Sequence, residues 1–332
     1  MGPGGLREIL GHASLPGGAW DPRVLVGLAA PDDAAVIAVG PGPALVLTAD
    51  VITPPCDDPF LFGQLAATNA MSDVYAMGGE PVAALNLCFF PEDDVVPPDV
   101  KSRILEGAAE RVAAAGASIV GGHTVRDAEL KLGLSVMGQV DPARILRKGG
   151  LRAGQALVLT KALGLGLIIN GYRNDACTAE ELETVLRAQV ALNRDAARIA
   201  VRFGATGATD ITGFGLVGHA LEMARGAGVR IRMAAAALPV LPLALALSER
   251  GIRSRGLRDN ETDGAPHLVV EGTLDPHLRV VCFDPQTAGG LLFGVDAARA
   301  EACVAALAAA GAAAARVVGR VEEGAPGLVV VA

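Results

Sequence analysis

Hydrophobic and polar positions follow two different periods along this chain, and together they predict a mixture of strands and helices. Residues 130–137 alternate apolar side chains with polar or small ones, which is the period-2 pattern of a strand with one buried face. Residues 98–116 begin with Pro-Asp and carry apolar side chains at helical spacing. A second helix is expected over 62–77, with Gly78 as its C-terminal stop. Further strand-like runs occupy residues 36–39, 44–49 and 82–90.

The order of these elements divides the chain into two halves. In the first half, about four strands and two long helices are segregated rather than strictly alternating, which indicates an α+β layer. A polar, glycine-rich stretch at 147–154 marks a boundary. We therefore expect an N-terminal domain over 1–150 and a C-terminal domain over 151–332.

Strands and helices mix throughout the second half. Strands are expected near 156–160 and 291–295, and a long helical region spans about 179–203. This mixture predicts an α/β architecture for the C-terminal domain.

Composition and charge restrict the functional classes. A chain of 332 residues is too long for one ordinary core and suits two domains. With a net charge of −8, the chain lacks the basic surface that binds nucleic acid. An acidic protein that binds an anionic nucleotide needs metal ions between its carboxylates and the phosphates. The most hydrophobic run, 234–247, is too short to span a bilayer. The dispersed cysteines favour reduced thiols, and the N-terminus lacks the pattern of a signal peptide. We therefore expect a soluble, cytoplasmic protein with no nucleic-acid or membrane partner.

Several aspartates in distinctive sequence positions are the candidate functional residues. Asp73 lies on a predicted helix of small and apolar residues, where a carboxylate is costly unless it faces a cation or hydrogen-bond donors. Asp32 and Asp33 precede a strand, Asp50 ends one, and Asp210 lies before a glycine-rich segment. Several carboxylates with few basic groups suit Mg²⁺ bound to ATP. The residues alone leave open the alternative that these are solvated loop aspartates.

Two glycine-containing segments, 121–124 and 212–215, are predicted to be turns that bring backbone N–H groups close to phosphate. Neither is a Walker A loop, because no Gly-Lys-Ser/Thr follows, and Gly164-x-Gly166 lacks the third glycine of a dinucleotide fingerprint. A structural role is the expectation for His219, and the residues alone favour one for His123 as well.

Taken together, five segments resemble the selenophosphate synthetase family (selenide, water dikinase) in order and spacing, from about residue 5 to the C-terminus. They are Asp-Asp-Ala-Ala-Val at 32–36, the Asn-Ala-Met-Ser-Asp helix at 67–79, Gly-Gly-His-Thr at 121–124, Thr-Asp-Ile-Thr-Gly-Phe-Gly within 209–219 and Asp-Pro-Gln-Thr-Ala-Gly-Gly at 284–290. The last two are the most specific. The first two are shared with the wider superfamily of aminoimidazole ribonucleotide synthetase.

The resemblance implies an enzyme that uses ATP, selenide and water to make selenophosphate, AMP and phosphate. It also implies a homodimer whose subunits have the two-domain architecture of aminoimidazole ribonucleotide synthetase. By position, the implied Mg²⁺ ligands are Asp33, Asp73 and Asp210. The implied nucleotide contacts are Asp32, Asp50, Asp73, Gly122, His123 and Thr124.

Two departures from the family pattern bear on activity. Ala30-Pro31 stand where the family usually has an arginine or similar polar residue, which puts one nucleotide contact in doubt. The family's glycine-rich loop with a reactive Cys or selenocysteine and a Lys has no counterpart, because Cys56 and Lys101 are the first residues of their types. We expect that loop upstream of Met1, behind an in-frame UGA codon, so that no catalytic residue is assigned. The competing explanation is a real loss of the loop.

The chain as it stands is therefore expected to bind Mg²⁺ and ATP but to turn over poorly or not at all. The alternatives are a thiamine-monophosphate kinase or hydrogenase-maturation enzyme of the same superfamily, or a non-catalytic nucleotide-binding relative. The Asp-Pro-Gln-Thr segment at 284–287 argues against the two enzymes.

Overall fold

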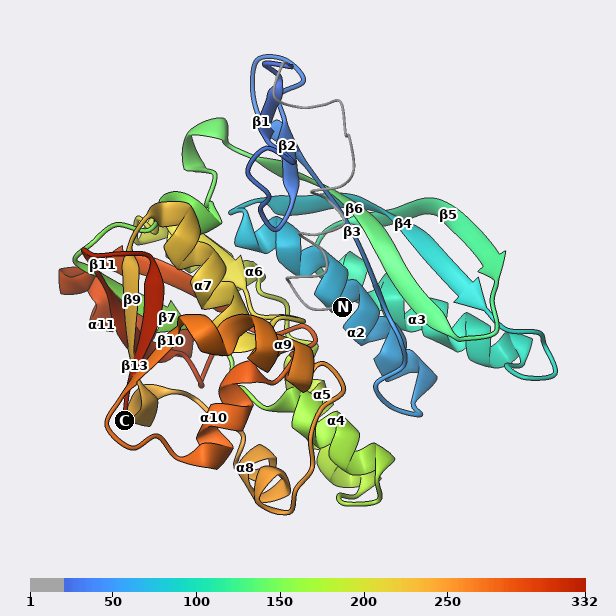
Figure 1. The fold of residues 1–332 in the computed structure, drawn as a ribbon. Coiled ribbons are helices and arrows are strands. Elements are labelled where there is room, and N and C mark those ends of the chain that lie inside the picture. Colours follow the sequence, from blue (N-terminus) through green and yellow to red (C-terminus); the bar gives the residue numbers. More distant parts are fainter. Residues whose placement is uncertain (1–20) are drawn as a thin grey trace. The chain divides into compact units, whose positions relative to one another are not determined.

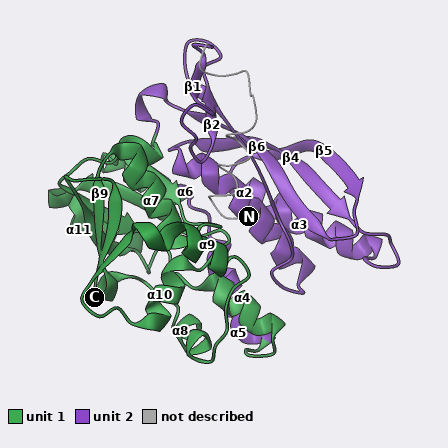
Figure 2. Ribbon diagram, viewed as in Figure 1, with its two compact units in different colours: residues 1–18, 146–178, 195–332 green, residues 19–145, 179–194 purple. Residues whose placement is uncertain are grey.

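A computed structural model describes residues 21–332, and these form two compact units (Figure 2). Unit 2 comprises residues 21–145 together with Ala179–Arg194, and unit 1 comprises Leu146–Thr178 and Asp195–Ala332. The first part of the family resemblance, from about residue 5 to residue 20, lies outside the described residues. Within 21–332, no helix combines the length and the apolar character needed to cross a membrane.

Unit 2 is built on a six-stranded sheet in the order β1-β2-β3-β6-β4-β5 (Figure 1). Its strands are β1 Val24–Val26, β2 Ala35–Ile37, β3 Ala44–Ile52, β4 Glu80–Phe90, β5 Ser118–Arg126 and β6 Lys131–Val140. Only β4 and β5 pair in parallel. Its helices are α2 Pro59–Ala76, α3 Pro98–Ala114 and α5 Ala179–Gln189. Because α2 packs against β3, β4, β6, α3 and α5, the core of the unit surrounds this helix.

Local signals fix the limits of α2. The Asp58 side chain accepts hydrogen bonds from the N–H groups of Phe60 and Leu61, and Pro59 occupies the first turn, where a missing N–H costs nothing. Gly78 follows with φ 76°, a left-handed conformation that favours glycine. The predicted helix at 62–77 is confirmed, with its start three residues earlier.

Tertiary contacts change two of the expected elements. Residues 121–124 are extended and belong to the edge strand β5, so the predicted glycine turn is wrong there. A Cβ at Gly122 would collide with the backbone of Asn86 on β4, which explains the glycine. The helical region at 179–203 is broken between α5 and α6. At the break, Thr68 on α2 donates to the Val190 carbonyl (3.3 Å), and the Asn193 amide donates to Ser72 (2.9 Å).

Unit 1 is a seven-stranded mixed sheet in the order β10-β13-β9-β12-β7-β11-β8. Its strands are β7 Gln155–Leu159, β8 Gly207–Asp210, β9 Arg230–Ala234, β10 Leu268–Glu271, β11 Leu291–Asp296, β12 Arg316–Glu322 and β13 Gly327–Val331. Its helices are α4 Leu165–Arg173, α6 Arg194–Arg202 (of which Arg194 belongs to unit 2), α7 Gly215–Ala227, α8 Pro242–Glu249, α9 Leu257–Gly264, α10 Pro276–Phe283 and α11 Ala300–Ala309. Residues 21–332 also contain the 3₁₀ turns η1 Pro142–Arg144, η2 Lys148–Gly150, η3 Ala235–Ala237, η4 Ala265–His267 and η5 Ala297–Arg299. The predicted fold class, α+β followed by α/β, is confirmed.

The sheet of unit 1 brings three loops to one edge. Strand β11 is antiparallel to both β7 and β8, so β7 and β8 run in the same direction. Leu292 of β11 pairs with Leu159 on one side and with Thr209 on the other, which sets the two strand ends at the same level. The loops that follow β7 and β8 therefore lie beside the loop that leads into β11.

Candidate metal and nucleotide site

Asp210 is the last residue of β8 and lies at this edge of unit 1. The residue is 1% exposed. Strand pairing fixes its place, because Asp210 lies opposite Leu291 and the next N–H group, that of Ile211, donates to the Gly290 carbonyl (2.9 Å). A carboxylate this deeply buried requires cations or hydrogen-bond donors.

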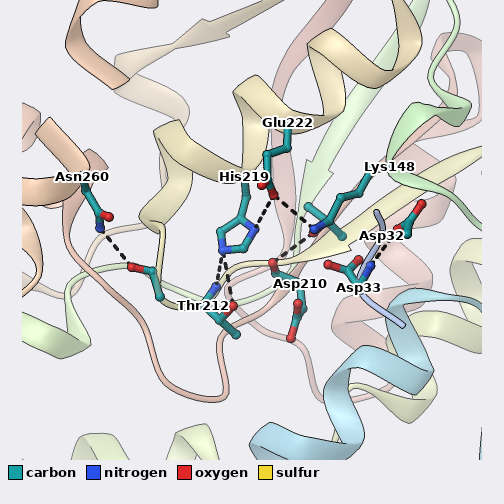
Figure 3. A network of polar contacts seen from close by, with 10 residues as sticks. Asp32, Asp33, Lys148, Asp210, Thr212, His219, Glu222 and Asn260 are labelled. Atoms are coloured by element: carbon teal, nitrogen blue, oxygen red, sulfur yellow. Dashed lines mark hydrogen bonds and ion pairs between the residues drawn. The ribbon is translucent and has the colours of Figure 1, made fainter. Parts of the chain in front are cut away.

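A polar network holds the loop after Asp210 (Figure 3). The Thr212 N–H donates to Nε2 of His219 on α7 (3.1 Å), so Nδ1 carries the proton of the neutral ring. Nδ1 lies 3.7 Å from Oε2 of Glu222, which in turn accepts a hydrogen bond from Nζ of Lys148 (3.1 Å). Burial, reinforced by the Lys148 charge, lowers the pKa of His219 well below its usual value. His219 is thus a neutral structural residue, as its sequence context indicates.

Lys161 follows β7 and places an ammonium group at the same edge. Its Nζ donates to the Ala288 carbonyl (2.8 Å), and Ala288 has φ 51° in the loop before β11. Burial lowers the pKa of Lys161 to about 7, and the charge of Asp210 opposes this shift. Lys161 is absent from the site residues that the sequence predicts. The available signal was a lysine two residues after the apolar run at 156–159.

In unit 2, strand β3 and helix α2 bring two of the predicted aspartates into paired contacts. Thr48 and Asp50 share one face of β3, because they are two residues apart. The Thr48 hydroxyl donates to Oδ2 of Asp73 (2.5 Å), and the Asn69 amide donates to Oδ2 of Asp50. Burial raises the pKa of Asp50, opposed by the hydrogen bonds from Val51 N–H and Asn69.

The remaining predicted residues of unit 2 lie elsewhere on its sheet. Asp32 and Asp33 are half-buried in the loop before β2, where the Asp33 N–H donates to Oδ1 of Asp32 (2.9 Å; Figure 3). Gly122, His123 and Thr124 are exposed on β5, and the strands β6 and β4 separate β5 from β3.

The predicted Mg²⁺ ligands come from both units, since Asp33 and Asp73 belong to unit 2 and Asp210 to unit 1. All three offer carboxylate oxygens, the ligand type that Mg²⁺ prefers, and they are half-buried or buried. The donor set fits the metal, and the ligand assignment stays a prediction.

Comparisons with known proteins cover both units. The family models described as AIR synthase related protein, N-terminal domain and C-terminal domain, match residues 31–140 and 152–331. The chain is similar to the "Selenide, water dikinase" of Geobacter metallireducens, with 44% identity over 88% of this chain and 84% of that protein. The protein of the same name from Pelobacter propionicus is 42% identical over 97% of this chain and 92% of its own length.

Solved structures share the fold at lower identity. The structure titled "AaThiL complexed with AMPPCP and TMP" has a TM-score of 0.67 and 23% identity, and covers 90% of this chain and 87% of its own. The structure titled "Crystal structure of HypE-HypF complex" has a TM-score of 0.71 and 18% identity, and covers 96% of this chain and 93% of its own. At these identities the likeness concerns the fold alone.

Proposed function

This chain belongs to the family of selenide, water dikinases, and on that premise we propose that it converts ATP, selenide and water to selenophosphate, AMP and phosphate. The observation that carries the proposal is the identity with relatives of that name, which extends through both units. The family that the motifs predicted is confirmed. The thiamine-monophosphate kinase and hydrogenase-maturation alternatives have support from the fold alone.

We propose that ATP binds with Mg²⁺ held by Asp33, Asp73 and Asp210. Two observations support this. The three side chains offer only carboxylate oxygens as metal ligands, and the Thr48 hydroxyl orients the Asp73 carboxylate through its hydrogen bond. When bound, Mg²⁺ would neutralise the charge of the phosphates and polarise the phosphoryl oxygens. The net charge of −8 also favours bound cations, because an acidic chain would otherwise repel a triphosphate.

Asp32, Asp50 and Asp73 are proposed as nucleotide contacts together with residues 122–124. Within one unit 2, two strands separate β3 from β5, so the two groups are on the order of 14 Å apart across the sheet. We propose that β5 of a second copy brings residues 122–124 to the nucleotide. The active form would then be a homodimer.

Exposed apolar side chains on the sheet of unit 2 support this dimer. Leu47 is 38% exposed, and it points away from α2 because its neighbour Thr48 bonds Asp73 on that helix. Leu85 on β4 and Val120 on β5 are exposed as well, at 44% and 66%. Apolar side chains gathered on one sheet mark a surface that a partner covers.

The test is an enzyme assay. The protein is expressed from its native gene, with the codons upstream of Met1 included and selenium in the medium. ATP, Mg²⁺ and selenide are supplied, AMP is followed by chromatography, and selenophosphate by ³¹P NMR. We expect AMP formation that requires selenide. Asp210→Asn, which removes one proposed ligand, should slow it at least ~10-fold. Release of ADP with phosphorylation of thiamine monophosphate, and no selenide-dependent AMP, would contradict the proposal.

A further inference from the structure

A buried amide in unit 1 uses every hydrogen bond that it can form. Gln286, in the loop before β11, is 5% exposed. Its Oε1 accepts from the N–H groups of Gly164 (3.1 Å) and Leu165 (3.0 Å). Its Nε2 donates to the carbonyl oxygen (2.7 Å) and to Oδ2 (3.0 Å) of Asp284. An amide whose donors and acceptors are all paired has one defined orientation, and losing any partner leaves a buried polar group unpaired.

The main chain of the same loop is bonded to the segment that carries Asp210. The Gln286 N–H donates to the carbonyl of Thr212 (3.0 Å), two residues beyond Asp210. A Cβ at Gly289 would collide with the carbonyl of Ile211, so the two chains are in close contact there. Movement of Gln286 therefore displaces the loop after β8.

The N-terminus of α4 is occupied by this loop. Free N–H groups at a helix start are a common site for phosphate. Here Gln286 takes those of Gly164 and Leu165, and Oδ2 of Asp284 accepts from Leu167 N–H (3.2 Å). A Cβ at Gly166 would lie 2.7 Å from Oδ1 of Asp284. These N–H groups hold the protein loop rather than a ligand.

We infer that Gln286 is a positioning residue for metal binding: it fixes the loop after β8 to the start of α4 and thereby sets the place of the Asp210 carboxylate. The inference rests on the proposed role of Asp210 as a Mg²⁺ ligand. Hydrogen-bonded groups behind a metal ligand commonly change metal affinity by roughly 10- to 100-fold when they are removed.

The experiment measures binding of a non-hydrolysable ATP analogue to the full chain as Mg²⁺ is titrated, with the melting temperature recorded for each protein. Gln286→Ala removes the four side-chain hydrogen bonds, and Gln286→Met removes them while it keeps the volume of the side chain. We expect the Mg²⁺ concentration for half-saturation to rise roughly tenfold in both. If the alanine variant does not fold, the same titration is made with Gln286→Met and with Gly166→Ala. The Cβ added at residue 166 on α4 would displace the Asp284 side chain.

Gln155→Ala is the matched control. Gln155 is also a buried glutamine of unit 1, and it bonds Thr206 (2.9 Å) and the Arg152 N–H (2.8 Å) at the opposite end of β7. We expect a lowered melting temperature with half-saturation by Mg²⁺ unchanged within about twofold. An equal shift in this control would assign the effect to general destabilisation and overturn the inference.

Asp210→Asn separates the inference from the proposed function. If Asp210→Asn raises the Mg²⁺ requirement while the folded Gln286 variants match the wild type, the positioning role is wrong and the metal assignment stands. If Asp210→Asn leaves the Mg²⁺ titration unchanged, the metal assignment itself fails, and the positioning role fails with it.

Discussion

At the scale of single residues, burial is the largest cause of the pKa shifts of Lys161, His219 and Asp284 in unit 1. Asp284 accepts hydrogen bonds from Leu167 N–H and Gln286, which favour its ionised form. Burial outweighs them and raises the pKa of Asp284 to about 7. The same cause lowers the pKa of Lys161, also to about 7. Both groups therefore change charge near neutral pH, far from the range in which they titrate in water.

The shift at Asp284 predicts a specific dependence of stability on pH. An aspartate in an unfolded chain has a pKa of about 4, so between about pH 4 and 7 the folded state keeps a proton that the unfolded chain has lost. The stability gained from protonated Asp284 is complete below pH ~4 and is lost as the pH rises through about 7. The unfolding free energy of the wild type should thus fall, relative to Asp284→Asn, by a few kcal/mol between about pH 4 and 8.

Urea denaturation of both proteins across this pH range checks the prediction. Asp296→Asn, a substitution of an exposed aspartate, is the control and should run parallel to the wild type. Parallel curves for wild type and Asp284→Asn would show that the carboxyl is ionised in the folded protein.

At the scale of elements, the crossing of α2 and α3 depends on two glycines. A Cβ at Gly63 would collide with the carbonyl of Ile104, and one at Gly107 would collide with the carbonyl of Phe60. The helices approach so closely because neither residue has a side chain. Since α2 carries Asn69 and Asp73, this contact also sets the position of two residues of the candidate site.

Gly63→Ala is expected to destabilise the protein by about 2–3 kcal/mol, because overpacking forces the two helices apart. Gly327→Ala is the control: at that glycine the nearest atoms lie 3.9 Å and 4.0 Å from the added Cβ, an ordinary contact. Its unfolding free energy should change by less than about 0.5 kcal/mol. Unfolding in urea provides both values, and equal stability of the two variants would contradict the close crossing.

At the scale of the whole molecule, the proposed dimer makes a prediction about assembly. Leu85→Asp places a charge on the exposed sheet face of unit 2, and desolvating that charge on association is costly. We expect sedimentation of the variant as a monomer and of the wild type as a dimer. Val269→Asp alters a valine on β10 of unit 1 that is 56% exposed, and it should leave the dimer intact. A wild-type monomer at micromolar concentration would contradict the proposal.

The sequence by itself determined the elements whose limits are local. Gly78 ends α2 where the sequence predicted, because a glycine conformation acts within one turn of the chain, whereas the start at Pro59 with Asp58 as its cap lies three residues before the predicted start. Period-2 alternation predicted β6 for the same kind of reason. The ordered motifs identified the family and the fold class, which the comparisons confirm. The aspartates of the candidate site were also named from sequence, as predictions of role.

Only the tertiary structure decided the features that arise between distant segments. Residues 121–124 became a strand because Asn86 on β4 lies against Gly122. The break after α5 coincides with hydrogen bonds to α2, far away in sequence. Lys161 and Gln286 form hydrogen bonds between loops that strand pairing brings to one edge of the sheet. A local pattern records the conformation that a segment prefers, whereas these contacts depend on which segments meet, and that is set by the packing of the whole sheet.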